Sequence, residues 1–302
     1  MSLKGLDGLL QTAPSFARAL DAASADSEFS VADGLRAPLI AGLIRRRREG
    51  GDRGAYLLIA ATSREADAIR QAVSSLLPDA LTTEFPAWET LPHERLSPSA
   101  ETVGRRAEAL RMLREYGENP DRSESGPLVI VASVRAALQP VSPHAAHAEP
   151  VVLRAGAEPL MGDGGHGLEA LSRRLVDFAY TRVDMVTRRG EFAVRGGILD
   201  VFPPAAEQAM RVDFFGDEVD QIRRFSVSDQ RSAGDPVETL ELWPARELLL
   251  TEEVRERAAE LLPQFPALST MLEKMTEGIA VEGMESLLPQ LVPGLAPLTA
   301  LL

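Results

Sequence analysis

Three short strand candidates separated by stretches of helical periodicity constrain the fold of this chain most strongly. Ala55–Ala61 and Leu128–Ala132 are apolar runs, typical of strands buried on both faces of a sheet. Leu81–Phe85 is a further short strand that follows the break at Pro78-Asp79. The alternation of strand and helix predicts a parallel sheet with crossover helices, an α/β fold. The helices expected around these strands are Gly34–Arg48, a helix capped by Ser63 and running to about Leu77, Thr102–Tyr116 and a helix beginning at Ser133–Leu138.

The pattern changes near Pro140–Pro150, which marks a candidate domain boundary. Beyond it, shorter β-like runs with tight spacing predict a small α+β domain with an antiparallel sheet. The elements expected there are a strand at Glu149–Arg154, a helix at Leu168–Phe178, strands at Asp184–Arg188, Glu191–Val194, Gly197–Phe202, Arg211–Phe215 and Gln221–Val227, and a returning strand at Leu240–Trp243. Phe215-Gly216-Asp217-Glu218 is a hairpin turn signal. Residues 252–302 are expected to form helices interrupted by prolines.

Composition narrows the classes of function. The chain has 302 residues, 45% of them hydrophobic, and no cysteine, so disulfides, thiolate nucleophiles and cysteine-ligated metal sites are excluded. A net charge of −13 argues against a dedicated nucleic-acid binder, and residues 235–302, with 4 basic and 12 acidic residues, should repel phosphate. No apolar run approaches the length needed to span a bilayer. We therefore expect a cytoplasmic protein without a membrane partner, and a monomer by default.

A nucleotide site would need a glycine-rich loop with a lysine and a hydroxyl residue at the start of a helix. The only candidate begins at Gly34, lacks the second glycine, the lysine and the hydroxyl, and contains Pro38, which removes a backbone donor. Gly34 is then an ordinary loop glycine, and we expect no cofactor.

Acidic side chains offer no better site for catalysis or metal binding. Glu89, Glu94 and Glu101 are interpreted as solvated loop charges, and a metal site formed by Glu89 and His93 is not expected. No nucleophile has a base beside it, so no catalytic residue is assigned.

The most informative stretch for function is Tyr180–Pro203, in which arginines alternate with aromatic residues. Arginine and aromatic side chains are the anchors that protein interfaces use most. An alternative interpretation is a solvated arginine-rich face paired with Asp184, Glu191 and Asp200. The basic and aromatic residues of the stretch are Arg182, Arg188, Arg189, Arg195, Phe192 and Phe202.

Motifs along most of the chain are similar to those of a known family. The chain resembles the UvrB-like region of the bacterial transcription-repair coupling factors, and its middle part resembles domain 2 of the excision-repair helicase UvrB. The motifs that carry the resemblance are Trp88-Glu89-Thr90-Leu91-Pro92, Val131-Ala132-Ser133-Val134, Gly190-Glu191-Phe192, the run from Arg195 to Pro203, and the run from Val212 to Glu218.

The resemblance implies three parts and a partner. Residues 1–143 would be domain 1a, a degenerate RecA-like domain without a P-loop; residues 144–234 would be domain 2; residues 235–302 would be domain 1b, truncated in an N-terminal fragment. Domain 2 would bind the A subunit of the UvrABC excinuclease (UvrA). Position in the family motifs assigns Arg182, Arg189 and Arg195 to that interface, while Phe192 and Phe202 are either interface or core residues.

Two departures from the family limit what the resemblance implies. The P-loop is missing, and the DNA-clamping aromatic hairpin of UvrB would fall between Phe85 and Thr102, where the chain is too short for it. The first hypothesis is therefore a non-catalytic module that recruits UvrA to stalled RNA polymerase, with polymerase and DNA bound by parts of a longer, ATP-dependent translocase. The second is an autoinhibitory domain whose surface is masked within that longer protein. A DNA-binding or ATP-hydrolysing fragment is the third.

Overall fold

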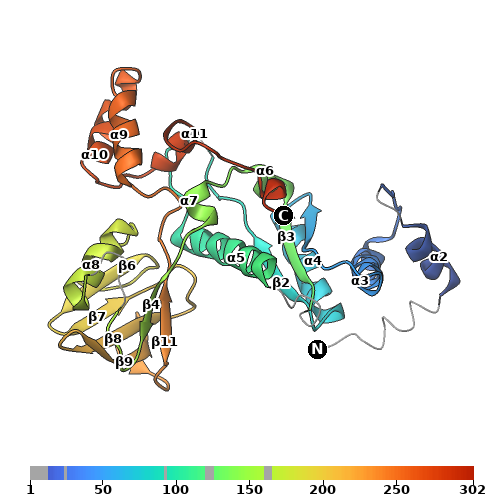
Figure 1. The fold of residues 1–302 in the computed structure, drawn as a ribbon, viewed down its shortest axis with the longest axis horizontal. Helices are drawn as coiled ribbons and strands as arrows, with labels where there is room; N and C mark the ends of the chain where they lie inside the picture. The colour runs from blue at the N-terminus through green and yellow to red at the C-terminus, as the bar shows by residue number, and fades with distance from the viewer. Residues whose placement is uncertain (1–12, 24–25, 92–93, 120–125, 160–164) are drawn as a thin grey trace. The chain divides into compact units, whose positions relative to one another are not determined.

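The computed structural model describes residues 13–23, 26–91, 94–119, 126–159 and 165–302 (Figure 1). The chain divides into two compact units, each assembled from separate stretches of sequence. Unit 1 comprises Met1–Ala87, Ala109–Gln139 and Pro297–Leu302, and unit 2 comprises Trp88–Glu108 and Pro140–Ala296. The boundary therefore passes through helix α5 (Ala100–Glu118), whose first half belongs to unit 2.

Unit 1 contains a three-stranded parallel sheet, as the alternating pattern predicts. Its strands are β1 (Tyr56–Ala60), β2 (Leu81–Phe85) and β3 (Leu128–Ser133), in the order β1-β3-β2. The α/β fold class is confirmed. All six residues of the central strand β3 are buried, because it is covered on both sides and paired along both edges.

One expectation about this sheet is wrong. Strand β1 was expected to be buried on both faces, but Ile59 is 49% exposed. The reason is topological: β1 pairs only with β3 and so lies at an edge of the sheet among the described residues.

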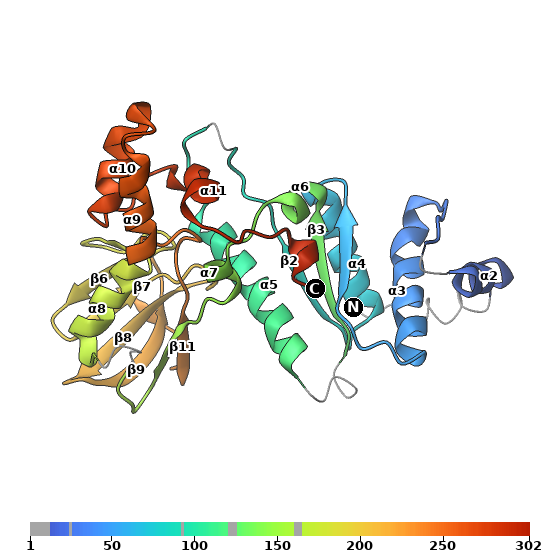
Figure 2. The ribbon, with the colours of Figure 1, turned by 45° about the horizontal axis from the view of Figure 1, so that its top comes forward.

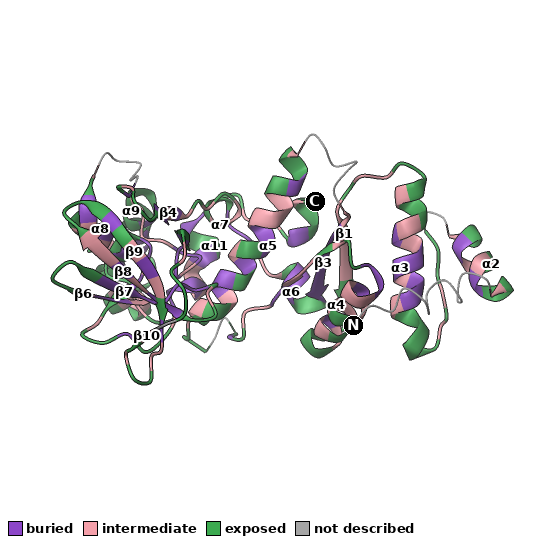
Figure 3. Ribbon diagram, turned by 90° about the horizontal axis from the view of Figure 1, so that it is seen from below, coloured by how far each residue is buried: buried purple, intermediate pink, exposed green. Residues whose placement is uncertain are grey.

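Helices α3 (Asp33–Glu49) and α4 (Ser63–Leu76) pack on this sheet through a shared core. The helical elements that lie wholly in unit 1 are α2 (Pro14–Ala22), α3 (Asp33–Glu49), α4 (Ser63–Leu76), α6 (Val134–Leu138) and the short η3 (Leu298–Ala300). Buried residues of α3 and α4, among them Ile44 and Val73, meet Val129 and Val131 of β3. Figure 3 shows the buried stripe along α3 between its exposed faces. The N-cap of helix α4 lies one residue earlier than expected, because the side chain of Thr62, not that of Ser63, accepts a hydrogen bond from Glu65 N.

Unit 2 is built around a six-stranded sheet in the order β10-β9-β8-β7-β6-β5, antiparallel except that β5 runs parallel to β6. Helix α8 (Gly167–Asp177) covers one face (Figures 1 and 2), where Leu171 and Leu175 join the core. The strands are β5 (Thr181–Arg182), β6 (Glu191–Arg195), β7 (Ile198–Val201), β8 (Ala209–Phe215), β9 (Glu218–Phe225) and β10 (Ser232–Ala233).

Within this sheet the expected Phe215–Glu218 turn is confirmed. Phe215 pairs with Glu218 across Gly216 and Asp217, and Gly216 has a φ of +65°, which favours glycine. The strand expected at Asp184–Arg188 is wrong. The backbone N–H groups of Thr187 and Arg188 donate instead to the carboxylate of Glu191, which folds this segment into a turn.

The rest of unit 2 is a two-stranded sheet and a helical segment. Strand β4 (Val151–Arg154) pairs antiparallel with β11 (Thr239–Leu242), and Leu240 and Leu242 join the same core as α8. The helices expected after residue 252 are present and have their own core, which includes Val254, Leu272 and Met284. The remaining elements are α7 (Pro143–Ala146), α9 (Glu252–Leu261), η1 (Pro266–Leu268), α10 (Ser269–Thr276), η2 (Met284–Leu287) and α11 (Leu288–Leu291).

Among the residues that the structure describes, no helix combines the length and the apolar character that a membrane span requires.

Candidate partner-binding surface

Two of the candidate arginines border one open hollow at the edge of the six-stranded sheet. Arg182 ends the edge strand β5, and Arg195 ends the neighbouring strand β6. The hollow has a volume of about 620 Å³ and is lined by Arg182, Val183, Asp184, Val194 and Arg195. Because β5 and β6 run parallel, the chain after Arg182 continues toward Arg195, and Val183 and Asp184 line the hollow between the two arginines.

Arg195 is held in place but remains accessible. Its guanidinium donates through Nη2 to the carbonyl oxygen of Asp184, and its Nη1 lies 3.9 Å from Oδ2 of Asp200. The side chain is still 51% exposed. An arginine fixed at one edge and open at the other is preorganised to bind a carboxylate with its remaining N–H groups.

Asp200, the buried acid beside Arg195, is mainly bound by a different residue. Its two oxygens accept hydrogen bonds from Nε and Nη2 of Arg211 at 2.6 and 2.9 Å. This hydrogen bonding with Asp200 raises the pKa of Arg211. The carboxylate of Asp200 is therefore bound closely by Arg211 and lies farther, at 3.9 Å, from Arg195.

The guanidinium of Arg182 has no hydrogen-bond or ion-pair partner within the described residues. The side chain is exposed at the sheet edge, and the parallel register places Arg182 opposite Phe192. Arg182 and Arg195 are thus on opposite faces of the sheet by register, and they meet only at the hollow on its edge.

Arg189 differs from the other two because its guanidinium is used inside unit 2. Its Nε donates to the carbonyl oxygen of Ala206 at 3.1 Å, and its Nη1 lies 3.1 Å from Oε2 of Glu101. The same group stacks 5.0 Å from the centre of the Phe202 ring. These contacts tie Arg189 to helix α5 and leave 29% of its side chain exposed.

The two candidate aromatic residues are core residues. Phe192 is fully buried in the core under α8, and Phe202 is buried on the opposite face with Val186 and Phe225. Consecutive residues of β6 point to opposite faces of the sheet. Phe192 therefore lies in the core under α8, whereas the next residue, Ala193, lies in the core that contains Phe202.

The alternative of a solvated face with internal ion pairs fits only part of this stretch. Glu191 binds backbone N–H groups, and Asp184 meets Arg195 through its carbonyl oxygen rather than its carboxylate. Of the three acidic residues Asp184, Glu191 and Asp200, only Asp200 forms an ion pair with a candidate arginine, at 3.9 Å from Arg195.

A segment distant in sequence completes unit 2. We call Trp88–Glu108 the strap; among its described residues, only the start of α5 is regular structure. Arg106 is fully buried and its Nε donates to Oε1 of Glu247, which also accepts from Nε1 of Trp88 at 3.0 Å. The Arg106 guanidinium lies 5.6 Å from the Trp88 ring centre.

Two further contacts hold the strap against the rest of unit 2: close backbone packing at Gly104 and a polar cluster around Ser97. A Cβ on Gly104 would lie 2.5 Å from the carbonyl carbon of Pro204, so α5 approaches that loop as only glycine allows. Ser97 Oγ accepts from Arg246 at 2.9 Å and donates to Glu285 at 2.6 Å. Burial raises the pKa of Glu285, although the nearby Arg246 opposes this shift.

The carboxylates considered for catalysis or metal binding have structural roles or lie apart. Glu89 accepts a hydrogen bond from Ser99 N at 2.8 Å. Burial alone would raise the pKa of Glu89, but hydrogen bonds from Ser99 and Thr102 outweigh it and lower the pKa. Glu94 accepts from Leu91 N at 2.7 Å. His93 lies outside the described residues, and no group of three potential metal-binding side chains occurs within them.

The stretch examined for a phosphate site is part of a helix. Residues 33–49 form α3, so Gly34 lies in its first turn and not in a loop before it. Arg36 pairs with Asp33 at 3.0 Å and with Glu65 at 2.7 Å. Two carboxylates therefore lie near the start of α3, and their negative charge disfavours a phosphate there.

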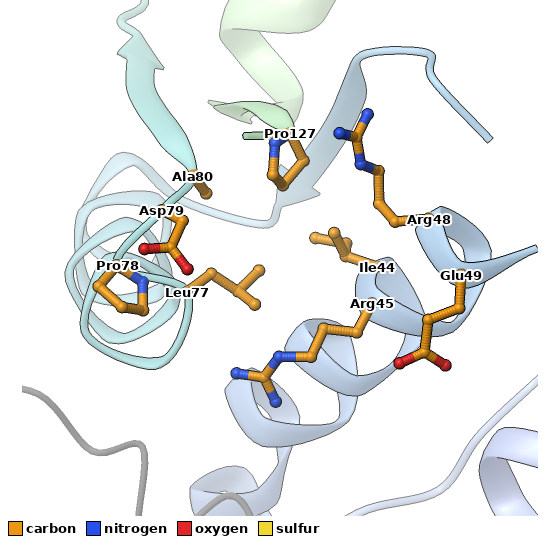
Figure 4. A pocket seen from close by; sticks show the side chains of 9 residues that line it. All are labelled: Ile44, Arg45, Arg48, Glu49, Leu77, Pro78, Asp79, Ala80 and Pro127. Carbon is orange, nitrogen blue, oxygen red and sulfur yellow. The ribbon is translucent and has the colours of Figure 1, made fainter. Parts of the chain in front are cut away.

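A hollow of about 520 Å³ lies at the other end of α3 (Figure 4). Arg45 donates to Leu76 O at 2.6 Å and Arg48 to the Tyr116 hydroxyl at 3.4 Å, so both guanidinium groups bind protein oxygens. The hollow adjoins Ala80 and Pro127, which precede β2 and β3. The hollow therefore lies at the amino ends of β2 and β3. Nucleotides bind at the carboxyl ends of parallel strands, which is the opposite edge of the sheet.

Comparison with known proteins identifies the region that carries the arginines. The family model described as "UvrB interaction domain" matches residues 163–248. Residues 163–248 belong to the UvrB interaction domain family. The match runs from the segment before α8 to Leu248, so Arg182, Arg189 and Arg195 all lie within the UvrB interaction domain, as does Glu247.

The resemblance to the coupling factors is also confirmed. A transcription-repair-coupling factor of Mycobacterium tuberculosis is 44% identical over 302 aligned positions, covering 96% of this chain and 23% of that protein. Those of Myxococcus xanthus and Bacillus subtilis are 34% and 31% identical over 82% and 80% of this chain. The chain thus spans about a quarter or less of the length of the relatives it matches.

Sequence reasoning missed one exposed residue of the UvrB interaction domain. Phe215 was interpreted only as part of a hairpin turn, yet its side chain is 84% exposed. The available signal was the alternation of β8, which places Val212 and Phe214 toward the core and Phe215 away from it.

Proposed function

We propose that this chain is a non-catalytic binding module whose UvrB interaction domain binds UvrA, the A subunit of the UvrABC excinuclease. The observation that carries the proposal is the match of residues 163–248, in which Arg182 and Arg195 stand exposed at one hollow. Arg189 supports this surface from the side through Glu101. Arginine forks bind carboxylates with two parallel hydrogen bonds, so the matching surface of UvrA is acidic.

In the longer protein, this binding would recruit the excinuclease to stalled RNA polymerase during transcription-coupled repair. Contacts with polymerase and DNA, and ATP-driven translocation, would belong to other parts of that protein. The proposed domains are 1a (1–143), 2 (144–234) and 1b (235–302), with strand β11 packing into the core of the middle part.

Titration of the purified chain with purified UvrA, followed by calorimetry, tests the proposal. We expect saturable binding that weakens as salt rises, because the surface is charged and accessible to solvent. Heat indistinguishable from dilution at low salt, with a chain that melts cooperatively, would show that the module does not bind UvrA.

We further expect no ATP binding by this chain. Asp33 and Glu65 flank the first turn of α3, and no lysine follows Gly34. Calorimetry with Mg-ATP should give no binding heat, with the UvrA titration of the same sample as the control for folded protein. A micromolar dissociation constant for Mg-ATP would contradict this expectation.

A further inference from the structure

Phe215 is the most exposed large hydrophobic residue among those described, at 84%. It ends β8 immediately before the two-residue turn formed by Gly216 and Asp217. A phenylalanine side chain presents a large apolar surface to water, which is unfavourable. A partner that covered this surface would gain free energy from its burial.

The neighbours of Phe215 on its face of the sheet include Arg195 of the proposed UvrA surface. Phe214 N donates to Gly197 O at 2.8 Å, which joins the β8–β9 hairpin to the turn after Arg195. Ile198 pairs with both Arg195 and Asp213, so these side chains share one face of the sheet. Alternation from Asp213 places Phe215 on that face too, and β7, β8 and β9 lie side by side in Figure 2.

A second exposed apolar residue links Phe215 to Arg195. Ile198 begins β7 directly after the Gly196-Gly197 turn and is 38% exposed. The face therefore presents an arginine, an aliphatic side chain and an aromatic side chain in succession. This combination is enriched at the centres of protein interfaces.

The hairpin that carries Phe215 is fixed from three sides. A register shift follows Asp213, and such bulges increase local twist and redirect side chains. The backbone of Val219 exchanges hydrogen bonds with Gly156 and Ala157 at 2.8 and 3.0 Å. Asp217 Oδ1 occupies the space where any side chain at Gly167 would lie, at the start of α8. The backbone that carries Phe215 thus has little freedom left to lose on binding.

We propose that Phe215 is an apolar anchor of the UvrA-binding surface and inserts into a hydrophobic socket of UvrA. The proposal rests on the proposed function, and it adds that the socket lies beside the acidic group that meets Arg195. The face then combines charged groups, which orient the partner, with an aromatic group that holds it.

The test is the affinity of UvrA for Phe215→Ala and Phe215→Tyr, measured by calorimetry on the full chain. We expect Phe215→Ala to weaken binding roughly 10- to 100-fold, as an anchor residue does. Phe215→Tyr should retain most of the affinity because it keeps the aromatic ring. Both variants should melt like the parent chain, since the side chain is 84% exposed.

Phe265→Ala is the matched control, because Phe265 is a phenylalanine in the same unit, 41% exposed and in the helical segment. Its affinity for UvrA should be unchanged. If Phe215→Ala binds like the parent chain while Arg195→Ala does not, the anchor is wrong and the UvrA proposal stands. If neither substitution changes the affinity, the whole face is wrong. Loss of self-association in Phe215→Ala with unchanged UvrA binding would assign the residue to a second copy of the chain.

Discussion

Arg195→Ala is expected to weaken binding of UvrA by roughly 30- to 1,000-fold, the range for truncating an arginine at the centre of an interface. Arg195 is held by the Asp184 carbonyl oxygen and remains 51% exposed, so the side chain is positioned and still accessible to a partner. Arg182→Ala should reduce the affinity as well, because its guanidinium borders the same hollow.

The lysine variant separates charge from geometry. Arg195→Lys keeps the positive charge but cannot form two parallel hydrogen bonds with a carboxylate, so most of the loss should persist. Arg189→Ala should lower the free energy of unfolding in addition to the affinity, because it removes contacts with Glu101, Ala206 and Phe202.

Arg224→Ala provides the control for these measurements by calorimetry. Arg224 is exposed on β9 opposite Met210, and strands β8 and β7 separate it from β6, which carries Arg195. It should bind UvrA like the parent chain. Equal affinities for Arg195→Ala, Arg182→Ala and Arg224→Ala, with unchanged melting, would leave the arginines as a solvated face.

Glu247→Ala is expected to lower the free energy of unfolding of unit 2 by about 3–5 kcal/mol, the usual consequence of leaving a buried charge without its partner. Arg106 is completely buried and Glu247 nearly so, and the indole N–H of Trp88 uses the same carboxylate. Urea unfolding followed by tryptophan fluorescence measures the change, because Trp88 and Trp243 are the two tryptophans of the chain and both lie in unit 2.

Two further variants test the physical cause. The double variant Arg106→Met with Glu247→Leu should recover much of the loss, since apolar residues of similar volume often replace a buried ion pair without penalty. Glu260→Ala breaks the exposed ion pair with Arg257 and should change the free energy of unfolding by less than about 1 kcal/mol. A Glu247→Ala variant as stable as Glu260→Ala would mean that the buried pair does not hold the strap.

The parts of the fold that depend on local sequence could be predicted. Short strand-like segments located β2 and β3 within a residue, and the Gly216-Asp217 turn located the β8–β9 hairpin. Strand order could not be derived in this way. That is why Ile59 of β1 was expected to be buried and is exposed at an edge.

The candidate site, too, could be predicted where it depends on local sequence and not where it depends on distant contacts. Composition and spacing identified the arginine stretch, which lies inside the matched UvrB interaction domain. They could not show that Arg189 bonds with Glu101, 88 positions away, or that Phe192 lies under α8. Contacts between residues so distant in sequence depend on tertiary packing, which neither propensity nor periodicity encodes.

The wide sequence separation of the strap from its partner has a consequence for synthesis of the protein. Arg106 precedes Glu247 by 141 residues. At about 5–20 residues per second, the ribosome needs roughly 7 to 30 s to supply the carboxylate after Arg106 has been made. An apolar side chain at this position would remain exposed to nascent-chain aggregation throughout that interval. The guanidinium of Arg106 can stay hydrated until Glu247 has been synthesised. A charged contact at this position therefore keeps the first half of α5 soluble until the rest of unit 2 is available to fold with it.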